Sequence, residues 1–138
     1  MKRKSERGQS LVEFAISLVI ILWLLAGAVE FGIALFQYIQ LRDAAQEGAL
    51  FGSVNPSKTS EIEARVRNAS SSPLDLTDTS QVFVTVLTPS GACVAQSVEV
   101  TVSYNHQVFM PFATLFTGGS TTIPLSATVI DTILDADC

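Results

Sequence analysis

Few residues of this chain have side chains that commonly carry out catalysis or bind metals. The 138 residues include one histidine, His106, and two cysteines, Cys93 and Cys138. The sequence contains no P-loop, GxGxxG turn, HExxH zinc motif or GxSxG nucleophile motif. His106 has no cysteine or second histidine beside it, so we predict an ordinary loop residue. The sequence therefore favours neither an enzyme nor a metal protein, and no cofactor is expected.

Two carboxylates, Glu13 and Glu30, stand out because an uncharged apolar run separates them. The run is sixteen residues long, from Phe14 to Val29. Since a helix rises about 1.5 Å per residue, residues 11–36 would extend about 39 Å, enough to cross a hydrocarbon core of about 30 Å. A charge at the centre of such a span costs about 2.5–3.5 kcal/mol. Both carboxylates are therefore expected either to mark the ends of a span or to meet a partner.

Charge is scarce and unevenly distributed along the chain. Charged residues make up 15% of the sequence, against about a quarter in soluble domains, which argues against both a disordered chain and an ordinary cytosolic domain. Residues 1–8 hold four basic side chains and one acidic one, so their net charge is +3. Because the whole chain has a net charge of −5, the other residues together carry −8. Basic residues before a span predict that this end stays cytoplasmic and that everything after Glu30 is exported. The acidic body predicts no nucleic-acid binding.

The residues around the start of the apolar run form a recognisable motif. Residues 8–14 have the sequence GQSLVEF, in which Gly8 is followed by Glu13 and Phe14. This resembles the processing site of type IV prepilins, which a membrane peptidase cuts after the glycine. The longer segments RGQSLVEFA, GAVEFGIALF and LRDAAQEGALFG resemble the TadE-like pseudopilins of Tad/Flp pilus systems. The resemblance covers about the first 52 residues.

The resemblance implies a structural subunit whose partners are other pilin subunits, the cytoplasmic membrane and a prepilin peptidase. Cleavage after Gly8 would give Gln9 a free α-amino group, which is largely cationic near neutral pH. Glu13 of one subunit would then meet this amino group on a neighbour, since pairing offsets the cost of burying a charge. Phe14 stands where Flp-type pilins often have tyrosine and lacks its hydroxyl group. Small residues around Glu30 would let another helix approach closely, which assigns Glu30 to assembly as well.

A secretory signal and an uncleaved single-pass anchor that starts at Met1 are the alternative explanations of the same N-terminal segment. A basic start, an apolar stretch and the small residues Ala26, Gly27 and Ala28 also fit a signal peptide with A-x-A cleavage. The mature protein would then begin at Val29 as a secreted soluble binding domain. Glu13 suits such an apolar region poorly, and the helical pattern continues through the cut.

The remaining sequence predicts an α+β organisation in three parts. They are a basic leader at 1–8, a long membrane and assembly helix within 9–52, and an exported head at 53–138. The helix, expected from about Ser10 to Phe51, becomes amphipathic after Glu30. In the head, a short helix is expected from about Thr59 to Ala69, with ion pairs between residues 61 and 65 and between 63 and 67.

A three-stranded antiparallel sheet is expected after residue 80. Valines alternate with other residues at 82–87 and 98–103, and a turn sequence at 89–91 separates these two strands. A third strand is expected from Thr122 to Thr132. The loop before the third strand is apolar, and it either caps the sheet or long helix or contacts another subunit; it contains Phe109, Met110, Pro111, Phe112, Leu115 and Phe116.

Cys93 and Cys138 both fall on the exported side, where disulfides persist, so we predict a bridge between them. An intermolecular bridge or free thiols are the alternatives.

Overall fold

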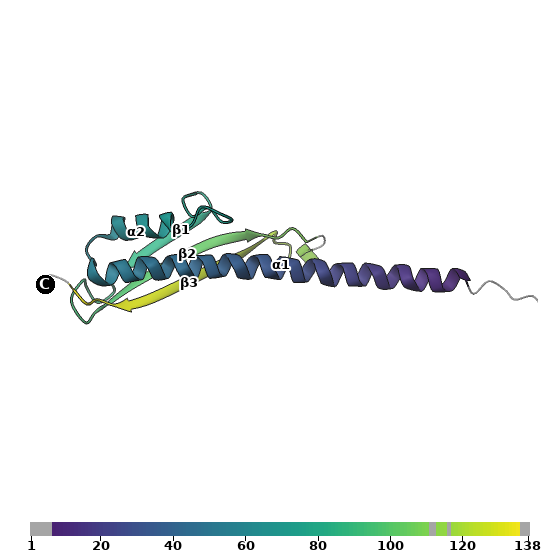
Figure 1. Cartoon of the computed structure of the whole chain (residues 1–138), viewed down its shortest axis with the longest axis horizontal. Coiled ribbons are helices and arrows are strands. Elements are labelled where there is room, and N and C mark those ends of the chain that lie inside the picture. The colour runs from purple at the N-terminus through teal and green to yellow at the C-terminus, as the bar shows by residue number, and fades with distance from the viewer. Residues whose placement is uncertain (1–6, 111–112, 116, 136–138) are drawn as a thin grey trace, which may run out of the picture.

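A long helix and a small α+β head make up the structure, a computed structural model that describes residues 7–110, 113–115 and 117–135. Helix α1 (Arg7–Val54) runs along the whole molecule, and its N-terminal half projects beyond the head (Figure 1). Helix α2 (Thr59–Asn68) follows after a short turn. The predicted α+β class is confirmed, and α1 extends the expected helix by three residues at each end.

The head contains a three-stranded antiparallel sheet in the order β1-β2-β3. The strands are β1 (Val82–Leu87), β2 (Ser97–Gln107) and β3 (Thr122–Thr132), with a short 3-10 helix η1 (Ala113–Leu115) before β3. In the central strand, Val102 is opposite Val84 of β1 and Ala127 of β3. The third strand has the predicted bounds, whereas the second continues four residues past the predicted alternation.

Both helices cover the same face of the sheet. α1 packs across β2 and β3, and α2 packs beside α1 and against β1. Successive side chains of a strand point to opposite faces, so every second residue of β2 faces the helices. These residues are buried, and they form the core with α1 and α2; the core contains Leu41, Ala44, Ala45, Ala49, Ile62, Val66, Val98, Val100, Val102 and Tyr104.

Small residues on one stripe of α1 allow the helix to lie close to the sheet and to α2. The stripe contains Ala44, Ala45, Gly48, Ala49 and Gly52, all buried. A Cβ atom added at Gly48 would lie 2.5 Å from Cγ2 of Val66, and one added at Gly52 would lie 3.0 Å from Cγ2 of Val98. These two positions therefore require glycine because of close packing.

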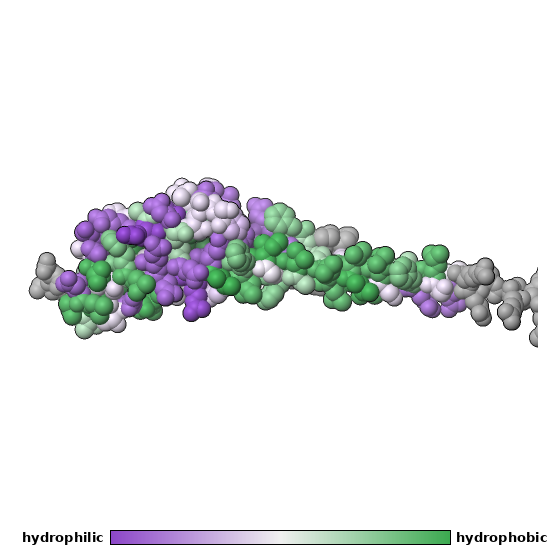
Figure 2. Space-filling view, viewed as in Figure 1, coloured by the Kyte–Doolittle hydropathy of each residue, from purple (hydrophilic) through white to green (hydrophobic). Residues whose placement is uncertain are grey.

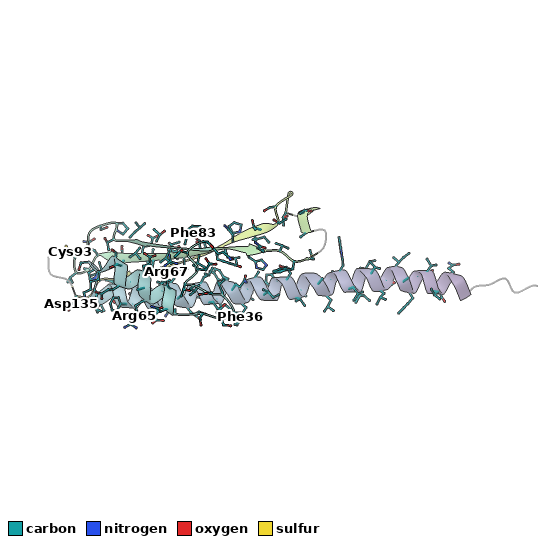
Figure 3. All side chains as sticks on the ribbon, turned by 90° about the horizontal axis from the view of Figure 1, so that it is seen from above. Phe36, Arg65, Arg67, Phe83, Cys93 and Asp135 are labelled. Carbon is teal, nitrogen blue, oxygen red and sulfur yellow. The ribbon has the colours of Figure 1, made fainter. Side chains whose placement is uncertain are left out.

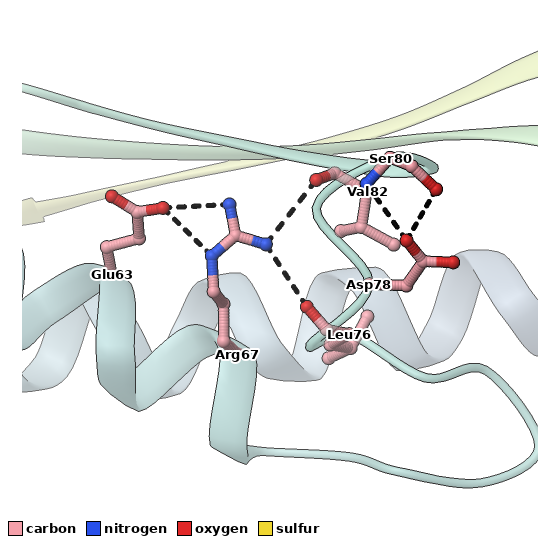
Figure 4. Close-up of polar contacts among 6 residues, drawn as sticks. All are labelled: Glu63, Arg67, Leu76, Asp78, Ser80 and Val82. Carbon is pink, nitrogen blue, oxygen red and sulfur yellow. Dashed lines mark hydrogen bonds and ion pairs between the residues drawn. The ribbon is translucent and has the colours of Figure 1, made fainter.

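Arg67 ties α2 to the segment that leads into β1. Its Nε donates to Oε1 of Glu63 at 2.8 Å, and its Nη1 donates to the carbonyl oxygens of Leu76 at 3.3 Å and Val82 at 3.4 Å (Figure 4). The predicted pair between residues 63 and 67 is thus confirmed.

The other predicted ion pair of α2 is wrong. Glu61 pairs with Lys58 at 3.3 Å, and Arg65 reaches across to Glu47 of α1 at 3.6 Å. Arg65 also lies over the ring of Phe51, 5.2 Å from its centroid. The presence of α1 beside α2 gives Arg65 a tertiary partner, which the spacing within α2 does not reveal.

Candidate functional site: the projecting helix and its junction with the head

The projecting half of α1 presents apolar side chains on all sides. Every residue from 11 to 25 is exposed, and the space-filling view shows a nearly continuous hydrophobic surface along this part of the molecule (Figure 2). Within the described residues, Gly8–Val54 is one helix long and apolar enough to cross a membrane, with a mean hydropathy of 2.4 in its most apolar window. None of that window is buried by the head.

Gly8 and Gln9 lie in the first turn of this helix, and both are exposed. An added Cβ at Gly8 would meet no atom within 4 Å. Its φ is also not among the positive values found at Gly91, Gly118 and Gly119. The fold of the described residues therefore places no steric demand for glycine at position 8.

Glu13 and Phe14 are also exposed on the projecting helix. Among the residues that the structure describes, Glu13 has no hydrogen bond or ion pair. Glu13 and Glu30 are seventeen residues apart on one helix, which separates them by about 26 Å at 1.5 Å per residue. The structure therefore does not bring the two carboxylates together.

Glu30 instead contacts the head through His106. Oε1 of Glu30 lies 2.7 Å from Nε2 of His106, and Oε1 of Gln37 lies 2.6 Å from Nδ1 on the other side of the ring. The backbone N–H of Phe109 donates to both oxygens of Glu30, at 3.2 and 3.1 Å. The His106 side chain is 1% exposed and that of Glu30 is 14% exposed. We call these four residues the junction cluster.

The prediction of His106 as an ordinary loop residue is wrong. His106 lies in β2 and is fully enclosed between the sheet and α1. The alternation of β2 puts it on the same face as Val102 and Tyr104. Continuing that alternation two steps past Val102 would have placed His106 against the helices, and this signal was available in the sequence.

The hydrogen bonds of the junction cluster restrict the protonation of the His106 ring. A ring protonated on both nitrogens satisfies both contacts, because it donates to the Glu30 carboxylate and to the Gln37 amide oxygen. Opposite an ionised Glu30, a neutral ring satisfies them only with the Gln37 amide turned over, so that its NH₂ group donates to Nδ1. In both cases the Glu30 carboxylate, although it lies on an apolar helix, accepts hydrogen bonds from two donors, Nε2 of His106 and the N–H of Phe109.

The loop after β2 contacts α1 on the side of the junction cluster that faces the N-terminus of α1. Sδ of Met110 lies 3.6 Å from the position of a Cβ at Gly27. Two apolar grooves of about 420 Å³ each lie beside Met110. The first is lined by Ile20, Trp23, Leu24 and Gly27. The second is lined by Leu22, Leu25, Ala26, Val29, Glu30, Ile33 and Phe109. The predicted capping of the long helix is confirmed for Met110. Pro111, Phe112 and Phe116 lie outside the described residues.

Cys93 lies at the end of the head far from the projecting helix, as does Asp135 (Figure 3). There the C-terminal segment runs beside the connection that contains Cys93, with N–H of Ala95 donating to the carbonyl of Ile133 at 2.9 Å. Cys138 lies outside the described residues, so its bridge to Cys93 stays a prediction.

Comparison with known proteins finds one family that resembles the long helix. Residues 8–50 match the family model of TadE-like proteins. Over these residues the chain is similar to TadE-like proteins, and we call them the TadE-like segment. The match confirms the resemblance inferred from the three sequence segments. The TadE-like segment ends within α1 and so includes the projecting half and the junction residues Glu30 and Gln37. No curated protein and no solved structure matches the chain.

Proposed function

We propose that this protein is a structural subunit, a minor or major pilin, of a Tad/Flp-type pilus. The observation that carries the proposal is the TadE-like match to a helix whose first half is apolar and uncovered. Such a surface is stable in lipid or against similar helices, and it is unfavourable in water. The helix thus anchors the subunit in the membrane before assembly and packs among other subunits afterwards.

Processing by a prepilin peptidase between Gly8 and Gln9 fits the absence of any steric need for glycine at position 8. The cut would leave a cationic α-amino group on Gln9. Glu13, one helical turn further along, is an exposed anion with no described partner inside its own chain. Pairing between Glu13 of one subunit and the amino terminus of a neighbour would remove the cost of burying each charge alone and would set the register between subunits.

In this proposal the protein resides in the bacterial inner membrane with its head exported, and it moves to a cell-surface pilus on assembly. Its partners are the membrane, the peptidase and other pilin subunits. Glu30 contributes to assembly from within the subunit, because the junction cluster fixes the head against the helix that packs in the filament. The protein performs no catalysis in this role.

The alternative, a soluble binding domain secreted after cleavage at Ala28, is less well supported. Ala28 and Val29 lie inside the continuous helix α1. Cleavage there would remove Gly27 and the other α1 residues of the groove that Met110 shares with Ile20, Trp23 and Leu24. It would also leave Glu30 at the second position of the mature chain, while His106 would remain buried beneath it.

Subunit incorporation tests the proposed function. We expect Glu13→Gln, which keeps the size of the side chain and removes its charge, to lower the amount of the subunit in purified pili well below that of the native protein. Ser17→Ala is the matched control, because Ser17 lies one turn further on the same face, is also exposed and carries no charge. Equal incorporation of Glu13→Gln and native subunits, at equal membrane levels, would contradict the pairing of Glu13 with a neighbour.

A further inference from the structure

We propose that Phe109 and Met110 form a second membrane contact, entering the outer half of the bilayer beside α1. The inference rests on the proposed function, because it takes α1 as a membrane span. It adds a contact that neither the TadE-like match nor the hydropathy of α1 contains, since these residues belong to the head and lie outside the matched segment 8–50. The partner of the surface formed by Phe109 and Met110 is lipid.

The position of Met110 along α1 gives the depth of the contact. Met110 shares a groove with Ile20, Trp23, Leu24 and Gly27, which precede Glu30 by three to ten residues. Sδ of Met110 lies 3.6 Å from the position of a Cβ at Gly27, three residues before Glu30. At 1.5 Å per residue, Met110 therefore lies about 5 Å beyond Glu30 toward the middle of the span. If the apolar run that ends at Val29 crosses the hydrocarbon, the tip of this loop must enter it too.

The chemistry of the loop suits an apolar environment. The 14 residues from Val108 to Thr121, which connect β2 to β3, contain no charged side chain. Phe109 is 76% exposed although it is a large apolar residue. Backbone groups in hydrocarbon need hydrogen-bond partners, and the N–H of Phe109 has one in the Glu30 carboxylate. The Glu30 carboxylate thus satisfies the hydrogen-bond donor of the Phe109 backbone and holds the loop against the helix.

Lipid is favoured over another protein because the surface is continuous with the span. Residues of α1 from Leu22 to Ile33 form one wall of the second groove, and Phe109 and Met110 form the other. Before assembly, lipid surrounds the wall contributed by α1, and it would therefore fill the groove as well. With the span and the loop both in the bilayer, the head would be held at a fixed tilt to the membrane surface.

Quenching of tryptophan fluorescence by brominated lipid tests the contact. Trp23 is the only tryptophan of the chain, so the native full-length protein in phosphatidylcholine vesicles, with and without bromine at mid-chain, reports whether α1 is in the bilayer. In a Trp23→Phe background, we expect the tryptophan introduced by Phe109→Trp to be quenched to an extent comparable with native Trp23.

The matched control is Leu87→Trp in the same background. Leu87 is apolar and exposed like Phe109, but it lies at the other end of the sheet, opposite Glu99. Brominated lipid should leave this tryptophan unquenched. Adding Glu30→Gln to Phe109→Trp should reduce quenching, because the carboxylate that holds the loop is lost.

The outcomes separate this inference from the proposed function. Absence of Trp23 quenching in the native chain would contradict the membrane span itself. Quenching of Trp23 without quenching at position 109 would overturn only the second contact. Protection of position 109 from aqueous iodide solely in assembled pili, with no effect of brominated lipid, would assign the surface to contact between subunits and would also overturn it.

Discussion

At the residue scale, the position of the head depends on a buried imidazole between two side chains of α1. His106 connects β2 to Glu30 and Gln37, which are seven residues apart on the helix. These contacts lie where the apolar half of α1 meets its head-bound half. A histidine here can satisfy two polar groups at once, which an apolar residue of the same volume cannot do.

Removing this imidazole is therefore expected to destabilise the head. In His106→Ala the Glu30 carboxylate keeps only the N–H of Phe109, so we expect the free energy of unfolding of the head to fall by about 2–4 kcal/mol. Thermal unfolding of the full chain in detergent micelles, followed by circular dichroism, measures the loss. Asn105→Ala, an exposed neighbour on the other face of β2, should change little. Equal effects of the two substitutions would contradict a structural role for the junction cluster.

Arg67 makes a second prediction at this scale. Its side chain is 18% exposed and donates to two backbone carbonyls as well as to Glu63, whereas Arg65 is 57% exposed and has one ion pair. Hydrogen bonds from a charged group contribute about 1.5–3 kcal/mol, so Arg67→Ala should cost an amount in this range. Arg65→Ala should cost less than about 1 kcal/mol, because exposed ion pairs contribute little. Urea unfolding of the two variants compares them directly, and a larger loss in Arg65→Ala would refute this assignment.

At the element scale, two glycines of α1 differ in what surrounds them. Gly48 is packed against Val66 and Val100, while an added Cβ at Gly32 would meet nothing within 4 Å. Gly48→Ala should destabilise the head by about 1–3 kcal/mol through overpacking, despite the higher helix propensity of alanine. Gly32→Ala should leave head unfolding unchanged. The melting temperatures of the two variants test this, and an unchanged value for Gly48→Ala would show that the helix and α2 move apart at little cost.

The segment between α2 and β1 should become weaker in acid. Hydrogen bonds from the side chain and then the backbone of Thr77 lower the pKa of Asp75, and those of Ser80 lower the pKa of Asp78 in the same way. A carboxylate with a lowered folded-state pKa stabilises the fold above its unfolded-state pKa, and this contribution is lost as the pH falls through the folded value. The loss is therefore expected below about pH 4.

Replacing both carboxylates tests this pH dependence. Asparagine can still accept the hydrogen bonds from Thr77 and Ser80 on its amide oxygen, and it does not titrate. Asp75→Asn with Asp78→Asn should therefore unfold with a smaller change between pH 6 and pH 3, which bracket the ordinary Asp range, than the native chain does. Asp43→Asn, at an exposed position of α1, should keep the native pH dependence. An identical profile for the double variant and the native chain would contradict the contribution of this segment.

The elements were predictable from sequence to different degrees. The long helix and the third strand were predictable from the sequence, and both have nearly the expected bounds. The second strand was predicted too short because Tyr104 and His106 are not valines, although they keep the same alternation. Polar residues that a neighbouring helix covers weaken the apolar pattern on which such predictions depend.

At the scale of the whole molecule, one helix serves two environments. Its first half is uncovered and apolar, and its second half carries a stripe of small residues into the core of the head (Figures 1 and 2). The sequence indicated this division through the position of Glu30. The position of Glu30 did not reveal the junction cluster, because Glu30 and His106 are 76 residues apart and meet only through tertiary folding.

The site residues inferred from the processing motif lie on the uncovered half, and Glu30 lies at its boundary. Gly8, Gln9, Glu13 and Phe14 are all exposed, so the fold leaves them accessible to a peptidase and to neighbouring subunits. Exposure within a single chain is expected for residues that act only between chains. Their roles are what the resemblance to type IV prepilins implies, and they stay predictions because contacts between subunits are not part of the fold of one chain.

The N-terminus of the protein isolated from cell membranes tests the central claim most directly. Edman sequencing or intact mass of the membrane-bound form should give a chain that begins at Gln9, because the helix stays attached after the basic leader is removed. A soluble exported protein that begins at Val29 would contradict the account, since it would lack the apolar half of α1 altogether.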